Sequence, residues 1–131
     1  MQKLILLMLM SLLPVLGFAK PDEENAGPVI EYVEMAPKFT VNLAEPRKYL
    51  MVNIQLLVEG AEAVENVKKH MPMLRHEIIM MMSGMHVADL QTAEQREALR
   101  IKTKELITQS LEKIHKSEGL TDVFFSEFLV N

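Results

Sequence analysis

The chain contains no cysteine among its 131 residues. This absence excludes disulfide bonds, thiolate zinc sites, iron–sulfur clusters and cysteine nucleophiles. The net charge of −4 argues against a nucleic-acid partner, because proteins of that class present a basic surface. Continuous apolar sequence is confined to one stretch near the N-terminus, which excludes a protein with several membrane spans. The length is sufficient for one folded domain.

Familiar catalytic motifs are also absent. The sequence has no Gly-x-Ser-x-Gly, no His-Glu-x-x-His and no glycine-rich phosphate loop. Neighbouring acids such as Glu23 and Glu24 lie in a polar segment, where carboxylates are normally solvated. We therefore expect neither enzymatic activity nor a cofactor.

Residues 1–19 contain the apolar stretch. Lys3 precedes it, Pro14 interrupts it, and the small residues Gly17 and Ala19 end it. This layout is typical of a secretory signal peptide cleaved after Ala19. A short, uncleaved membrane anchor is the alternative, although residues 4–19 would span only about 24 Å as a helix, against roughly 30 Å of hydrocarbon. In both cases we expect export, followed by a flexible linker at residues 20–28 and one domain at 29–131.

The first half of that domain predicts strands. Apolar residues alternate with polar ones over residues 29–35, 38–43 and 48–59, and the last of these segments is the strongest. Its apolar face is continuous and suits a sheet that has one side on the core. A fourth strand is expected at 121–130, in the middle of the sheet, with Val123, Phe125 and Leu129 opposite Phe124, Phe128 and Val130.

Helical periodicity occupies the region between these strands. Apolar residues recur every three or four positions from 61 to 85, and Pro72 should kink this helix or start a second one. Thr92 and Gln95 match a capping box at the start of a helix over 92–116. The expected order is β-β-β-α-α-β. It predicts an α+β domain with an antiparallel-type sheet of about four strands and helices on one face.

Methionine is the residue in clear excess. The chain has eleven, and residues 70–86 contain six of them together with three histidines. Thioether and imidazole groups suit Cu(I), so Met71, Met73 and His76 are candidate ligands. Core packing and contact with a partner protein are the alternatives, because methionine fills irregular gaps and adapts to partner surfaces. We expect Met73, Met80 and Met81 to form such an interaction surface.

Several short motifs resemble those of the flagellar basal-body-associated FliL family. Residues 32–59 contain an aromatic–Pro–x–Phe–x–Val–Asn–Leu pattern followed by an Arg-Tyr-Leu-type strand. Residues 72–75 match a Pro-x-x-Arg helix, residues 90–99 a Leu-x-Thr helix start, and residues 124–130 a closing Phe-x-Glu-Phe-type strand. The residues that carry the resemblance are Pro37, Phe39, Val41, Asn42, Leu43, Tyr49, Leu50, Pro72, Arg75, Phe125, Glu127 and Phe128.

The resemblance implies a role that neither the composition nor the spacing of residues would reveal. It implies a non-enzymatic protein beside the flagellar motor, associated with the inner membrane and located in the periplasm. It also implies binding to the stator, support of swimming or swarming, a stomatin-like fold and assembly into a homo-oligomeric ring. The alternatives are a periplasmic Cu(I)-binding protein and an exported scaffold with no motor role.

Overall fold

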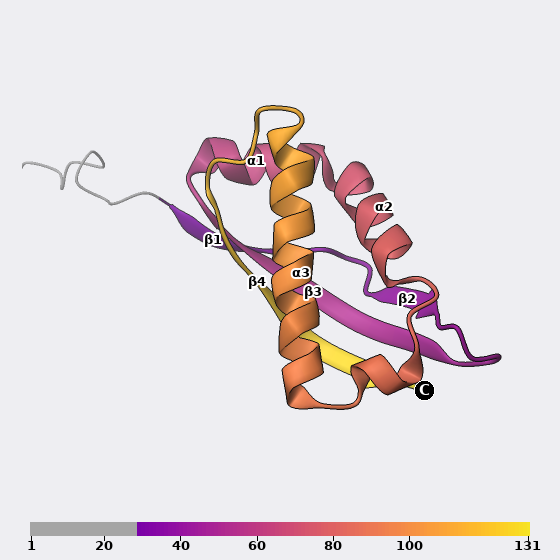
Figure 1. Cartoon of the computed structure of the whole chain (residues 1–131). Helices are drawn as coiled ribbons and strands as arrows, with labels where there is room; N and C mark the ends of the chain where they lie inside the picture. Colours follow the sequence, from indigo (N-terminus) through magenta and orange to yellow (C-terminus); the bar gives the residue numbers. More distant parts are fainter. Residues whose placement is uncertain (1–28) are drawn as a thin grey trace, which may run out of the picture.

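The computed structural model describes residues 29–131, so the signal peptide or anchor expected at 1–19 and the linker expected at 20–28 lie outside the described residues. The described part is a small α+β domain with one four-stranded sheet (Figure 1). Its elements are β1 (Ile30–Glu34), β2 (Phe39–Asn42), β3 (Tyr49–Glu59), α1 (Ala61–Lys69), α2 (Met71–Met82), the 3-10 turn η2 (Val87–Leu90), α3 (Ala93–Glu112) and β4 (Leu120–Val130).

Strand β3 is the centre of the sheet. It pairs antiparallel with β1 and then β2 along one side, and with β4 along the other. The α-helices lie together on one face of the sheet (Figure 1). The expected fold class and the antiparallel sheet are therefore confirmed. The expected position of the last strand is wrong, because β4 lies at an edge and β3 occupies the centre.

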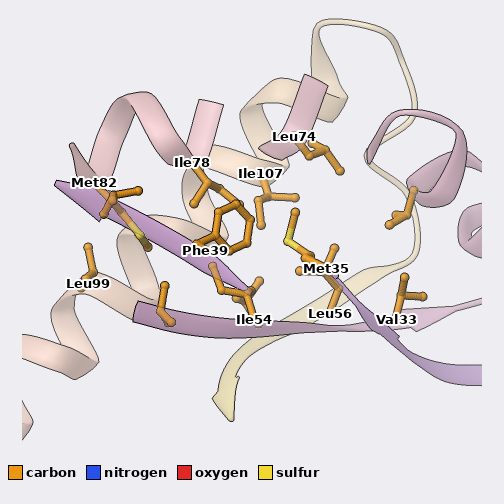
Figure 2. Packing of buried hydrophobic residues seen from close by; sticks show 14 of the residues in the cluster. Val33, Met35, Phe39, Ile54, Leu56, Leu74, Ile78, Met82, Leu99 and Ile107 are labelled. Carbon is orange, nitrogen blue, oxygen red and sulfur yellow. The ribbon is translucent and has the colours of Figure 1, made fainter. Parts of the chain in front are cut away.

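The core forms between the sheet and the helices. Every second residue of β3 is fully buried on the helical side, and these residues are Leu50, Val52, Ile54, Leu56 and Val58. Figure 2 shows Met35 and Phe39 packed between this strand and side chains of α2 and α3, among them Leu74, Ile78 and Ile107. The alternation in the sequence predicted this face of β3 because a strand points successive side chains to opposite sides.

Pro72 separates two helices. Helix α1 ends at Lys69, and α2 begins at Met71 with the proline in its first turn. Proline is tolerated there because the first backbone N–H groups of a helix have no intrahelical partner. The described chain therefore has three α-helices where the expected order had two.

Helix α3 begins as predicted and ends earlier. The Gln95 N–H donates to Thr92 Oγ1 at 3.1 Å, and the Thr92 N–H donates to Gln95 Oε1 at 3.0 Å, which confirms the capping box. The helix stops at Glu112 rather than at residue 116, and His115 adopts a left-handed φ of 57°. A residue in that conformation cannot continue a right-handed helix.

A β-bulge changes the faces of β4. Asn53 pairs with Glu127 and Ile54 with Phe125, so Ser126 is an extra residue on β4. An extra residue shifts the alternation beyond it by one position. Phe125 and Phe128 therefore share the helical side, with ring centroids 5.7 Å apart, and Leu129 points outward. The expected grouping of Leu129 with Val123 and Phe125 is wrong for this reason.

Gly119 allows the close approach of β4 to the start of α1. Its φ is 92°, and a Cβ atom there would overlap the Ala63 side chain and the Glu59 carbonyl. Gly84 has a similar φ of 80°, but a Cβ there would meet nothing within 4 Å.

We expect Gly119→Ala to destabilise the chain by roughly 2–4 kcal/mol, because it adds a steric overlap to the strain of a left-handed backbone. Gly84→Ala, which adds the strain alone, should lose about 1 kcal/mol. Urea unfolding of the two full-length variants measures this difference. Equal losses would show that the contact of Gly119 with Glu59 and Ala63 is unimportant.

Candidate interaction surfaces

Helix α2 buries one methionine and exposes another. Leu74, Ile78 and Met82 are fully buried, whereas Met80 is 64% exposed. Met73 and Met81 are half-buried and pack against the core. Of the three methionines expected to form a surface, only Met80 is therefore largely free. The reason is helical geometry, since Met81 lies about 100° from Met82 and so borders the buried stripe.

The candidate copper ligands do not share one face of α2. Met71 and His76 line the same surface depression, together with Pro37 and Ile79, but Met73 is absent from its lining. Positions two residues apart on a helix differ by about 200°, which directs Met73 away from Met71. Within residues 29–131, no three His, Asp or Glu side chains are grouped so that they could hold a metal ion.

The face of the sheet opposite the helices is open. Tyr49, Met51, Asn53 and Gln55 on β3 are only half-buried on this side. The Tyr32 and Phe124 rings approach each other on the flanking strands, with centroids 6.3 Å apart. The Lys38 ammonium and the Glu127 carboxylate form an exposed ion pair of 3.0 Å between the two edges. This mixed apolar and polar surface is a candidate for contact with another protein.

Asn53 is unusual on this open face. Its Nδ2 donates to Glu34 Oε1 at 3.0 Å, but its Oδ1 is buried without a hydrogen-bond partner among the described residues. It also lies where the bulge of β4 begins. A buried acceptor without a hydrogen-bond partner lowers the stability of the fold.

Arg75 joins two of the motifs that the sequence singled out. Its Nη1 donates to the backbone oxygens of Met35 at 2.7 Å and Pro37 at 2.6 Å. Its guanidinium carbon lies 4.1 Å from the centroid of the Phe39 ring. Partial burial lowers the pKa of Arg75, but an arginine normally titrates above pH 12, so it remains charged at neutral pH. Arg75 thus fixes the β1–β2 connection to α2.

Other residues of the motifs are buried in the core or join the ends of strands. Val41, Leu43 and Leu50 are buried in the core. The Asn42 carbonyl accepts the Gly84 N–H at 2.9 Å, and the Tyr49 hydroxyl accepts from Asn131 Nδ2 at 2.7 Å. These contacts hold the ends of β2, β3 and β4 in place.

A groove between α3 and β4 was missed by the sequence reasoning. It has a volume of about 530 Å³ and is lined by Ala93, Arg96, Glu97, Arg100, Phe124, Phe125 and Phe128. The Arg96 guanidinium lies 4.8 Å from the Phe128 centroid, and that of Arg100 lies 5.9 Å from the Phe124 centroid. The only sequence signal was the pairing of three phenylalanines in one strand with two arginines spaced four residues apart.

Acidic groups neutralise Arg100 within this groove. Its Nη1 donates to Asp122 Oδ1 at 2.7 Å and to the Val123 carbonyl at 2.9 Å, and Glu97 also binds the guanidinium. The hydrogen bond from the Val123 N–H holds the pKa of Asp122 below its ordinary value of 3.8, and the Arg100 guanidinium lowers this pKa to a smaller extent. Arg100 likewise lowers the pKa of Glu97.

A second depression of about 430 Å³ lies where α1 begins, and its lining includes Gly60, Glu62, His115 and Gly119.

In the region from residue 29 onward, none of the helices has the length and apolar character needed to cross a bilayer.

We expect Arg75→Ala to lower the free energy of unfolding by roughly 2–3 kcal/mol, because it removes two hydrogen bonds from a charged donor. Arg75→Lys should lose less, since an ammonium can still bind one of the two carbonyls. Lys69→Ala, at an exposed position on α1, serves as the control and should change stability by less than about 0.5 kcal/mol. Chemical denaturation measures all three variants. An unchanged free energy of unfolding for Arg75→Ala would contradict the proposal that Arg75 fixes the β1–β2 connection to α2.

The pKa of Asp122 predicts a pH dependence of stability. Because its folded-state pKa is lower than the ordinary value of 3.8, the carboxylate stabilises the fold above that pH. This contribution is lost as the pH falls through 3.8 toward the folded-state value. Asp122→Asn should therefore flatten the decline of stability below about pH 4.

The matched control is Asp89→Asn, since the Asp89 carboxylate takes part in none of the side-chain hydrogen bonds or ion pairs of residues 29–131. Thermal unfolding at a series of pH values measures both variants. Parallel pH profiles for Asp122→Asn and the unsubstituted chain would contradict the assignment.

Comparison with known proteins identifies the family. The family model described as "Flagellar basal body-associated protein FliL" matches residues 32–130. The flagellar protein FliL of Aquifex aeolicus (strain VF5) is 31% identical over 99 residues, a match that covers 74% of this chain and 59% of the relative. The chain thus matches less than two thirds of that relative's length.

The matched range includes the elements joined by Arg75, the strongest strand β3 and the closing strand β4. The resemblance recognised in the sequence is thereby confirmed, and this chain belongs to the FliL family of flagellar basal-body-associated proteins.

Proposed function

We propose that this chain is a non-enzymatic accessory protein of the flagellar motor that acts by binding other proteins. The observation that carries the proposal is the family match over residues 32–130, which covers almost the whole described domain. The partner we propose is the stator, the membrane complex that generates torque. Its function would be to support motility under load, as in swarming.

The proposed location is the periplasm, at the outer side of the inner membrane. Support comes from the sequence of residues 1–19, with one lysine, an apolar run and small residues near its end. Cleavage after Ala19 would give a soluble periplasmic protein, and retention would give an anchored one. In either case residues 20–28 would connect that segment to the domain that begins at residue 29.

The proposed mode of action is assembly into a homo-oligomer that contacts the stator. The domain offers surfaces suited to this role, because Met80 on α2 and the open face of the sheet expose apolar side chains. Exposed apolar patches on a small protein commonly mark contacts with other proteins. Met80 is the one residue of the expected methionine surface that is free to make such a contact.

Deletion of the gene tests the function. We expect the deletion to reduce swarming on soft agar and swimming in viscous medium, with normal flagellar filaments. Expression of the full chain should restore both. Fractionation of a tagged full chain should place it in the periplasm or with the inner membrane. Normal motility of the deletion strain under load would contradict the proposal.

Substitution of Met80 tests the surface. We expect Met80→Asp to reduce the ability of the full chain to restore swarming, because a charge there would oppose burial against a partner. The matched control is Ile101→Asp, since Ile101 is 45% exposed on another helix, α3. Both variants should accumulate to the normal level on immunoblots. Equal restoration by the two variants would rule out α2 as the contact surface.

A further inference from the structure

The surface depression that contains Met71 and His76, here called the α2 depression, has a volume of about 630 Å³. It lies where the β1–β2 connection meets helices α1 and α2. Most of its lining residues are apolar, and these are Ala36, Pro37, Met71, Pro72 and Ile79. Met71 is half-buried and the other four are exposed. A concave surface with exposed apolar side chains favours burial against another molecule.

Met80 extends this apolar surface along α2. It lies four residues after His76, which lines the depression, so the two residues share one side of the helix. Ile79 is 38% exposed and Met80 is 64% exposed. A partner segment that contacts Met80 therefore lies beside the α2 depression.

The ionisable side chains that line the α2 depression are all basic. They are Lys68 of α1 and Arg75 and His76 of α2. The chain as a whole has the opposite balance, with 18 acidic residues against 14 lysines and arginines. The groove between α3 and β4 contains Glu97, and the depression at the start of α1 contains Glu62. A carboxylate that enters the α2 depression thus meets cationic side chains and no acid of the lining.

Arg75 supplies a charge that no acidic side chain neutralises within residues 29–131. Its Nη1 donates to two neutral groups, the backbone carbonyls of Met35 and Pro37. Arg75 takes part in none of the ion pairs of this region. Its position over the Phe39 ring, 4.1 Å from the centroid, holds the guanidinium in place. A guanidinium fixed in this way can bind a carboxylate with little further loss of side-chain freedom.

Lys68 and His76 add two exposed groups that a ligand can engage. The Lys68 Nζ lies 3.5 Å from Glu31 Oε1, and the two side chains are 56% and 45% exposed. An ion pair so open to solvent contributes little to stability, so Lys68 can also bind a carboxylate from outside. His76 is exposed and takes part in none of the hydrogen bonds or ion pairs of residues 29–131.

We propose that the α2 depression, together with Met80, binds an apolar segment of a partner protein that carries carboxylate groups. Apolar side chains of this segment pack on Pro37, Ile79 and Met80, and its carboxylates bind the basic side chains of the lining. Charge of this kind selects the partner and speeds the encounter with it. The inference rests on the proposed function for its biological role, and it adds the chemical class of the segment that the partner presents.

Photo-cross-linking in cells tests the inference. A photoreactive phenylalanine analogue replaces Ile79 or His76 in the full chain, and mass spectrometry identifies the captured segment. We expect both positions to capture the same segment, which is apolar and contains aspartate or glutamate. The control places the same analogue at Ile101, which is 45% exposed on α3 and should not capture this segment.

Charge reversal tests the part played by the basic side chains. In a chain with the photoreactive group at position 79, Lys68→Glu and His76→Glu should each lower the cross-linking yield roughly fivefold, because repulsion replaces attraction. The matched control is Lys69→Glu, since Lys69 is exposed on α1 but does not line the depression. It should change the yield by less than about twofold. All three variants should accumulate to the normal level on immunoblots.

The inference is overturned if the captured segment contains no acidic residue, if it belongs to another copy of this chain, or if positions 79 and 76 capture only lipid or nothing. It is also overturned if Lys69→Glu lowers the yield as much as Lys68→Glu. Capture of an acidic, apolar segment from a protein outside the flagellum, with normal motility of the deletion strain, would retain the inference and reject the motor function. Loss of swarming on deletion without any capture would have the opposite meaning.

Discussion

Strand β3 imposes the constraint on which the rest of this domain depends. Its buried side chains fill one face, and its backbone is paired with β1 and β2 on one side and with β4 on the other. The helices can pack only where those side chains project. Each remaining element is therefore located by its contact with this strand, directly or through Phe39 and the residues around it (Figure 2).

This arrangement leaves two kinds of surface available for binding. One is the open face of the sheet, and the other is the outer side of α2 at Met80. Because the helices pack on one face of the single sheet, its other face stays uncovered within residues 29–131 (Figure 1). For a member of the FliL family, which is associated with the flagellar basal body, such surfaces suit a protein that works by contact with neighbours.

Strictly local patterns were predictable from the sequence. The alternation in β3 and the capping box at Thr92 and Gln95 depend on neighbouring residues alone, and both are confirmed. The bulge at Ser126 was not predictable, because it arises from the pairing of β4 with β3. The edge position of β4 depends likewise on topology. Its many phenylalanines suggested a central strand, but β4 lies at an edge, where Phe125 and Phe128 face the helical side and Arg96 of α3 lies over the Phe128 ring.

The candidate interaction surfaces were likewise predictable only where they depend on local sequence. The motifs that contain Pro37 and Arg75 were recognised in the sequence, whereas their contact through backbone carbonyls required the fold. The exposed position of Met80 could be predicted from the helical period. The half-buried state of Met73 and Met81 depends on how α2 is rotated against the core, which periodicity fixes only approximately.

Co-purification with the motor tests the central claim, a partner-binding role at the flagellar basal body, most directly. A tagged full chain, expressed at its natural level, would be isolated from gently solubilised cells, and the captured proteins identified by mass spectrometry. The account predicts recovery of stator subunits, at a level that falls when Met80 is replaced by Asp and is unchanged when Ile101 is replaced by Asp. Recovery of no flagellar protein, from a chain that is folded and correctly located, would contradict it.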